Sequence, residues 1–304
     1  MRNKLIGLLA ILMGCASCNP DPQNQQNSPS IVCSTGMIGD MVKNLVGDSI
    51  EVITLMGPGV DPHLYKATQG DISALSNSHV IVYNGLHLEG KMSSIFEKLG
   101  KSKSIIALSD GIDRKDLINS SDFEGAQDPH IWFDASLWSK AMLSVSKKLQ
   151  KSFPHLKDHI QKNESLYKAK LEDLHQYCLK QISQIPDNQR IMITAHDAFK
   201  YFGRAYNIQV RGLQGISTTA EFGLQDISLL VQFVVDKKIK AIFVESSVPP
   251  KSIEAVIEGC QKRGHDVKLG GELYSDAMAS KDSPAGNYIG MVKHNLHCIV
   301  KALK

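Results

Sequence analysis

The longest stretch without a helix-breaking residue lies in the middle of the chain. From about Leu156 to Ile185 there is neither glycine nor proline, and Pro186 ends the run. A helix of about 30 residues would be roughly 45 Å long, which is more than one small domain needs. Charged side chains dominate it, and its apolar residues are too sparse for the heptads of a dimerising coiled coil. Because such a polar helix usually bridges two domains, we predict a linking helix at residues 155–186.

The segments on both sides of this helix alternate between short apolar runs and amphipathic runs. Residues 31–154 include the apolar run His79–Tyr83, which is typical of a buried parallel strand, and residues 187–304 include the similar run Ala241–Val244. Strands that alternate with helices imply parallel sheets covered on both faces. We therefore predict an α/β protein with two βα lobes, joined by one long rigid helix, and a cleft between the lobes.

Local signals set the expected ends of several elements. Asp71 is expected to cap a short helix, and Glu89–Leu99 is expected to form the next one. A further amphipathic helix is predicted at Ala135–Lys151, and the final strand at Val267–Leu269.

The start of the chain is typical of a secretion signal. Arg2 and Lys4 precede the nine-residue apolar run Leu5–Met13, which is too short to span a bilayer as a stable anchor. The stretch Asn19–Ser30 is rich in proline, asparagine, glutamine and serine, as flexible tethers are. This order of parts argues against an ordinary cytosolic start.

A candidate lipidation site lies between these parts. Leu12-Met13-Gly14-Cys15 resembles the lipobox of bacterial lipoproteins, in which the cysteine is acylated and becomes the new N-terminus. Cys18 is the alternative, although no aliphatic residue stands three positions before it. We expect a signal peptide at residues 1–14, a tether at residues 15–30 and a lipid on Cys15. The protein would then be extracytoplasmic, in the periplasm or at the cell surface, and anchored to the membrane without crossing it.

Charge and cysteine content exclude further classes of function. The formal net charge is +3, and loss of Arg2 and Lys4 with the signal peptide leaves about +1. A nucleic-acid-binding protein would need a concentrated basic face, so we expect no nucleic-acid partner. The cysteines after Cys18 form no Cys-x-x-Cys pair, which argues against a thiolate zinc site or a redox dithiol. Cys260 and Cys298 could form a disulfide outside the cytosol.

One three-residue motif occurs twice in the first half of the chain. Asp61-Pro62-His63 returns 67 residues later as Asp128-Pro129-His130. Proline fixes its own φ and restricts the residue before it, so each Asp-Pro is a stiff extended turn. A histidine held after such a turn loses little entropy when it binds a metal ion. A single copy is also typical of an ordinary surface turn, but the repetition favours a metal site.

Ligands of open α/β sheets bind beyond the carboxyl ends of the strands. The polar residues at such positions are His63, His130, His196 and Asp276, followed by Glu245, His87 and Glu221. The first four would place three imidazoles and one carboxylate at the lobe interface, a donor set that suits Zn²⁺ or, with higher coordination, Mn²⁺ or Fe²⁺. A single anionic ligand leaves the site positively charged, so we expect supporting acids nearby, with Glu245 and Asp128 as candidates.

Each candidate also has an ordinary structural interpretation. His196 could cap the helix after its strand, and Asp276 could be a helix N-cap or an Asx-turn residue. Glu221 and Glu245 could satisfy backbone donors in loops, and His87 is more typical of a packed residue beside a helix start. The remaining histidines fit no loop at a strand end and are expected at the surface or on helices.

Seven motifs, in order along the chain, resemble those of one protein family. They are Met56–His63, Asn84–Glu89, Asp128–Asp134, Thr194–Phe199, Gly215–Thr218, Val244–Ser247 and Tyr274–Asp276. Their combination is similar to the zinc/manganese ABC-transporter substrate-binding lipoproteins (TroA- and ZnuA-like, periplasmic solute-binding protein family 9), over nearly all of the mature chain. The resemblance implies two βα lobes on one rigid helix, with a metal ion in the cleft held by His63, His130, His196 and Asp276.

The resemblance also implies a function. The protein is expected to be a monomer that captures Zn²⁺ or Mn²⁺, with Fe²⁺ as the third candidate, and delivers it to a membrane permease without catalysis. Members that favour manganese often carry glutamate at the third ligand position, so His196 favours zinc. The long histidine-rich loop of many zinc-dedicated members is absent between Glu89 and Asp128, which leaves the metal open. A zinc-dependent hydrolase, with Glu245 or Glu221 as base, and a lipoprotein adhesin are the alternatives.

Overall fold

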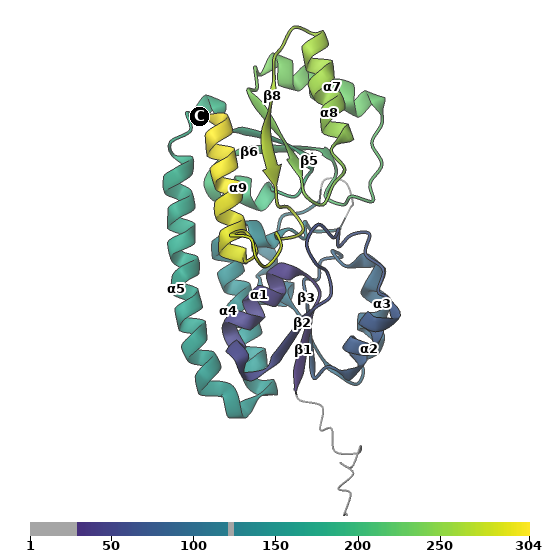
Figure 1. Ribbon diagram of the computed structural model, residues 1–304, viewed down its shortest axis with the longest axis vertical. Coiled ribbons are helices and arrows are strands. Elements are labelled where there is room, and N and C mark those ends of the chain that lie inside the picture. The colour runs from purple at the N-terminus through teal and green to yellow at the C-terminus, as the bar shows by residue number, and fades with distance from the viewer. Residues whose placement is uncertain (1–28, 121–124) are drawn as a thin grey trace, which may run out of the picture.

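The computed structural model describes residues 29–120 and 125–304. The predicted signal peptide, the lipidation site at Cys15 and most of the tether lie outside this range. Two groups of parallel strands lie one above the other, and a long helix runs beside both (Figure 1). The predicted α/β architecture is therefore confirmed. In the described part of the chain, no helix is long and apolar enough to cross a membrane.

Four parallel strands form the sheet of the N-terminal lobe, in the order β2-β1-β3-β4. They are β1 (Ser30–Cys33), β2 (Glu51–Thr54), β3 (Val80–Tyr83) and β4 (Ser104–Ala107). Ile31 of β1 pairs with Val52 of β2 on one side and with Val80 of β3 on the other. The two central strands are almost completely buried, as their continuous apolar sequences predict.

Helices cover both faces of this sheet (Figure 1). Alternate strand residues point to opposite faces, so β1 and β3 contribute to two separate apolar clusters. One cluster includes α1 (Gly36–Val46) and α4 (Ala135–Ser152), and the other includes α2 (Gln69–Asn77) and α3 (Ser93–Leu99).

Two helix starts in this lobe differ from the sequence prediction. Thr68, not Asp71, is the N-cap of α2, and Asp71 completes a capping box by accepting the backbone N–H of Thr68. Glu89 does not begin a helix, because its buried carboxylate accepts hydrogen bonds from the backbone N–H groups of Asn84 and Gly85 and from the hydroxyl of Ser34. α3 consequently starts at Ser93, after a short 3₁₀ turn.

The C-terminal lobe contains two pairs of parallel strands that lie side by side. β5 (Ile191–His196) pairs with β6 (Gln209–Gln214), and β7 (Ala241–Glu245) pairs with β8 (Lys268–Leu273). The helices of this lobe are α6 (Lys200–Tyr206), α7 (Leu224–Asp236), α8 (Lys251–Lys262) and α9 (Tyr288–Leu303).

The last strand continues beyond the predicted end at Leu269, through two glycines. A Cβ atom on Gly270 would lie 2.5 Å from the ring of Phe243, so glycine is required for this ring to pack against β8. The sequence signal was misleading here because glycine usually weakens a strand, whereas this one allows close packing.

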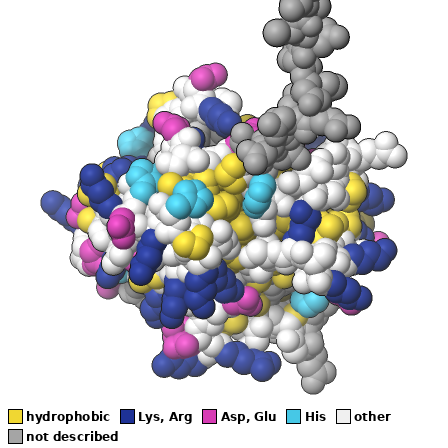
Figure 2. All heavy atoms as spheres, turned by 90° about the horizontal axis from the view of Figure 1, so that it is seen from below, with side chains coloured by type: hydrophobic (Ala, Val, Ile, Leu, Met, Phe, Trp, Pro, Cys, Tyr) yellow, Lys and Arg dark blue, Asp and Glu magenta, His cyan; other side chains and the backbone are white. Residues whose placement is uncertain are grey.

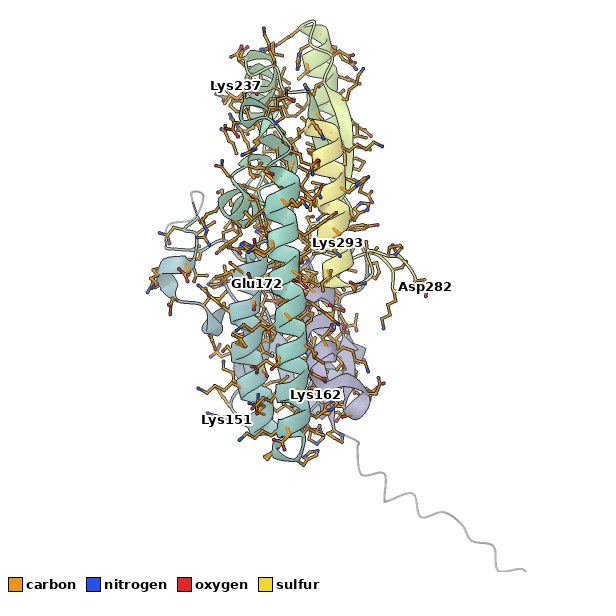
Figure 3. All side chains as sticks on the ribbon, turned by 90° about the vertical axis from the view of Figure 1, so that its left-hand side faces the viewer. Lys151, Lys162, Glu172, Lys237, Asp282 and Lys293 are labelled. Carbon is orange, nitrogen blue, oxygen red and sulfur yellow. The ribbon has the colours of Figure 1, made fainter. Side chains whose placement is uncertain are left out.

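The linking helix is α5 (Lys157–Ile182). Its 26 residues span about 39 Å. The expected first residues, 155–156, lie in a 3₁₀ turn instead, and the expected last residues, 183–186, form a non-helical turn before a second 3₁₀ turn at Asp187–Gln189. It packs against α1 and α4 at one end and against α6 and α9 at the other. The few apolar residues suffice because they fall on one buried stripe: Ile160, Tyr167, Leu171, Leu174, Cys178 and Ile182. Its outer face is charged, as Lys162 and Glu172 show (Figure 3).

One apolar core joins the two lobes through these helices. It includes Ile31 of β1, Trp138 of α4, Leu171 of α5 and Tyr288 of α9. The rings of Trp138 and Tyr288 stack with their centroids 5.2 Å apart. α5 is therefore packed along its length and is not a free span between domains.

The cysteines do not form the disulfide considered above. Cys260 is buried in the core of the C-terminal lobe and Cys298 lies partly exposed on α9, and both are free.

At the end of the molecule where β1 begins, lysine and arginine side chains are interspersed with acidic and histidine side chains (Figure 2).

Candidate metal centre

The four predicted ligand residues meet between the lobes. His63 lies in the segment after β2, His130 precedes α4, His196 ends β5, and Asp276 follows β8. One ligand atom from each residue lies within 4.8 Å of the ligand atoms of the other three, and all four residues are buried. Since His63 and His130 come from the N-terminal lobe, the repeated motif supplies only half of the cluster.

Three distances between the ligand atoms are close to those of a tetrahedral site, and the fourth is longer. His130 Nε2 lies 3.4 Å from His63 Nε2 and 3.3 Å from His196 Nε2. Asp276 Oδ2 lies 3.4 Å from His196 Nε2 and 4.0 Å from His63 Nε2. Ligands at about 2.1 Å from a tetrahedral ion are roughly 3.4 Å from one another. The three histidines therefore present the same ring nitrogen to one common point.

Carboxylates orient two of the imidazoles from behind. Asp128 Oδ1 lies 2.7 Å from His130 Nδ1 and accepts the backbone N–H of His130 at 2.9 Å. Glu245 Oε2 lies 2.5 Å from His196 Nδ1, and its Oε1 accepts the backbone N–H of His196 at 2.8 Å. A proton held on Nδ1 by such a carboxylate leaves Nε2 free to bind a cation.

His63 is held through its backbone by Asp61, the first residue of the repeated motif, which the sequence analysis did not propose as a supporting acid. Asp61 Oδ1 accepts the backbone N–H of His63 at 2.8 Å, which closes the Asp-Pro-His turn. Its other oxygen accepts the hydroxyl of Thr218, at 2.6 Å, from the opposite lobe. Asp61 thus ties the first histidine to the C-terminal lobe.

Asp276 is positioned by contacts on both sides of it. The indole N–H of Trp132 donates to the backbone oxygen of Ser275 at 3.0 Å, and the side chain of Asn295 binds both backbone groups of Tyr274. Asp276 Oδ1 is buried, has no hydrogen-bond partner among the described residues and lies 3.6 Å from His130 Nε2. A cation at the common point would satisfy this oxygen.

The Asp128–Asp134 loop is fixed by two further side chains. The amide of Asn84 donates to the backbone oxygen of Pro129 at 2.9 Å, and the hydroxyl of Tyr201 donates to the backbone oxygen of Asp128 at 2.9 Å. Asn84 and Trp132 stand inside motifs that the sequence singled out, whereas nothing local to Tyr201 indicated its contact.

Burial and charge act differently on the titratable side chains. Burial lowers the pKa of His63 to about 3, although Asp276 acts in the opposite direction. Burial also disfavours the charged form of His196, but the carboxylates of Glu245 and Asp276 outweigh it and hold the pKa of His196 well above its usual value. For Asp276, burial is outweighed by the imidazoles, chiefly that of His196, so its pKa is lowered. The direction of this shift favours the imidazolium form of His196 when no metal ion is bound.

The remaining candidates lie outside the cluster. Glu221 is exposed in the loop before α7. His87 is also exposed, and it lines a cavity that His63 lines as well.

Comparisons with known proteins agree with this geometry. The family described as zinc-uptake complex component A, periplasmic (ZnuA), matches residues 31–302. The chain belongs to the ZnuA family. This confirms the resemblance inferred from the seven motifs.

Members of the ZnuA family with different named metals are similar to this chain. Manganese-binding lipoprotein MntA of Bacillus subtilis is 44% identical over 96% of this chain and 95% of its own. Zinc-binding protein TroA of Treponema pallidum is 44% identical over 90% of this chain and 89% of its own. An iron ABC transporter substrate-binding lipoprotein, MtsA of Streptococcus pyogenes, is 32% identical over 96% of this chain and 94% of its own.

The solved structure of the Treponema pallidum TroA protein has the same fold. It aligns with a TM-score of 0.88 at 43% identity, over 91% of this chain and 99% of that one.

Proposed function

We propose that this protein is the extracytoplasmic metal-binding component of an ABC importer. His63, His130, His196 and Asp276 would hold one divalent transition metal ion, which the protein delivers to a membrane permease. The close approach of His130 Nε2 to the ring nitrogens of His63 and His196, at 3.4 and 3.3 Å in a buried site, carries this proposal. Zn²⁺ and Mn²⁺ are the first candidates and Fe²⁺ is the third, which agrees with the metals in the relatives' names.

Binding and delivery fit the centre better than hydrolysis. A catalytic zinc ion keeps one position open for water or substrate, whereas these four side chains supply a full tetrahedral set. We assign Asp128 and Glu245 to orienting the histidines.

We further propose that the protein is a monomer, anchored through a lipid on Cys15.

Metal analysis of the purified protein tests this function. Protein isolated without chelators should contain close to one equivalent of zinc, manganese or iron, and calorimetry should show one saturable site. The same sample should show no turnover in a screen of ester, phosphate and peptide substrates. Metal-dependent turnover, or binding unaffected by loss of His196 and Asp276, would contradict the proposal.

Metal affinity should fall as the pH is lowered from 8 to 5. His63 is neutral in this range because its pKa is about 3, so it does not compete. His196 retains its proton in the metal-free protein because its pKa is raised, and the ion must displace that proton. Each displaced proton changes the affinity by about tenfold per pH unit below the pKa. Calorimetry across this range measures the slope, and a flat profile would contradict the histidine site.

Glu245→Gln provides a matched variant for the pH experiment. The amide removes a charge that raises the pKa of His196, so the dependence of affinity on pH should become weaker. Its affinity at pH 8 should nevertheless fall by about 10- to 100-fold, because loss of a carboxylate behind a ligating histidine weakens metal sites by this amount. Glu258→Gln, at an exposed position on α8, should leave both quantities unchanged.

A further inference from the structure

We propose that metal ions enter and leave the centre through the cavity beside His63, and that His87 is the first side chain to bind them. This inference rests on the proposed function, because it concerns the path to the same centre. It assigns a role to His87, which lies outside the four-residue cluster.

The exposure of the four cluster residues indicates the side from which an ion can reach them. The side chain of His63 is 3% exposed, whereas those of His130, His196 and Asp276 are 0% exposed. His63 is therefore the side chain of the centre that solvent can reach. Among the four cluster residues, His63 is therefore the first that an arriving ion reaches.

A cavity of about 400 Å³ lies against His63. Its N-terminal-lobe wall includes His87, Gln127 and Pro129, and its C-terminal-lobe wall includes Ile216 and Thr219. The volume exceeds the roughly 30 Å³ that one water molecule occupies in the liquid by about tenfold. A hydrated divalent ion can therefore enter it and lose its water molecules in steps.

His87 is held at this cavity by an unusual backbone. Gly85, Leu86 and His87 have φ values of 83°, 53° and 63°, all in the left-handed region. This conformation costs roughly 1–2 kcal/mol for each residue that is not glycine, so the surrounding structure must stabilise it. Buried Glu89 accepts the N–H groups of Asn84 and Gly85, and the N–H of Leu88 donates to the oxygen of Gly85.

This arrangement places a single exposed imidazole on the path to a buried cluster. One ring nitrogen of His87 can replace one water molecule of a hydrated ion. The ion then moves from His87 to Nε2 of His63 as further water molecules leave. A lone imidazole binds too weakly to retain the ion against four converging ligands. His87 is therefore expected to change the rates of metal association and dissociation and not the Kd.

Stopped-flow kinetics of zinc binding and of zinc removal by a chelator test this role. His87→Asn keeps a residue that tolerates the left-handed backbone but lacks the imidazole. We expect its association and dissociation rates both to fall by about fivefold, with less than a twofold change in Kd, because both end states are unchanged. His297→Ala, an exposed histidine on α9 outside this cavity, is the control and should match the wild type.

Lys91 gives an independent test of the path, since it lines the same cavity. Its positive charge repels an approaching cation, so Lys91→Met should accelerate association by about two- to threefold at low ionic strength. Unchanged rates in both variants, or a Kd that weakens as much as the association rate falls, would overturn the inference. If wild-type protein shows no saturable zinc uptake, the proposed function fails and this inference fails with it.

Discussion

His130→Ala is expected to weaken zinc binding by at least about 100-fold while the fold is retained. Nε2 of His130 is central to the cluster, at 3.3–3.6 Å from the ligand atoms of His63, His196 and Asp276. Protein zinc sites with four ligands are worth about 10–16 kcal/mol, so one ligand contributes roughly 3 kcal/mol, or two orders of magnitude. Competition with a chelator of known affinity measures the change.

The control must separate lost ligation from lost structure. His130→Ala leaves the buried carboxylate of Asp128 without its imidazole partner, which can cost about 1–3 kcal/mol of stability. Circular dichroism should still show a folded protein, and His155→Ala at an exposed position should bind normally. In the wild type, metal at 100 times Kd should raise the free energy of unfolding by about 2.7 kcal/mol, and the variant should lose this gain. Near-normal affinity in His130→Ala would refute the ligand assignment.

Trp132→Ala is expected to affect both stability and metal binding. Trp132 is buried between the lobes, and its backbone oxygen accepts the hydroxyl of Tyr288 at 2.7 Å while its indole N–H binds the residue before Asp276. Truncation of a buried tryptophan typically lowers the free energy of unfolding by about 3–5 kcal/mol. Denaturant unfolding of the metal-free protein measures this loss.

Trp132→Phe separates packing from positioning. Most of the ring volume remains, but the oxygen of Ser275 loses its donor, so we expect a smaller loss of about 1–3 kcal/mol. Metal affinity should still fall, because the loop that holds Asp276 is less constrained. If both variants bind metal as the wild type does, the indole contact does not position Asp276.

The candidate site was more predictable than the ends of the elements around it. His196 ends β5, and His63, His130 and Asp276 lie in the segments that follow β2, β4 and β8. The geometry of parallel sheets brings such positions together. The contacts of Asp128 and Glu245 agree with the acids expected from the charge of the site, whereas the contact of Asp61 with His63 was not foreseen. Tyr201 could not be foreseen, because its contact with Asp128 joins residues 73 positions apart and depends on how the lobes pack.

Tertiary contacts also explain where local signals failed. Glu89 had the properties of a helix residue, but its carboxylate accepts hydrogen bonds from the backbone N–H groups of a strained loop. Gly270 resembled the end of a strand, and its lack of a side chain is what allows Phe243 to approach. The spacing of cysteines says nothing about burial, so Cys260 and Cys298 could be considered as a pair although Cys260 is enclosed in a core.

The shared apolar core has a consequence for how this molecule can be divided. Although the two βα halves look like separate modules, α5 and α9 bury residues against both, and Trp138 packs on Tyr288 across the boundary. A fragment that ends near either edge of α5 would expose this surface to water and lose its main source of stability. The two βα halves are therefore not independent folding units. A split-protein reporter cut between them would have to reassemble the shared core before it could bind an ion.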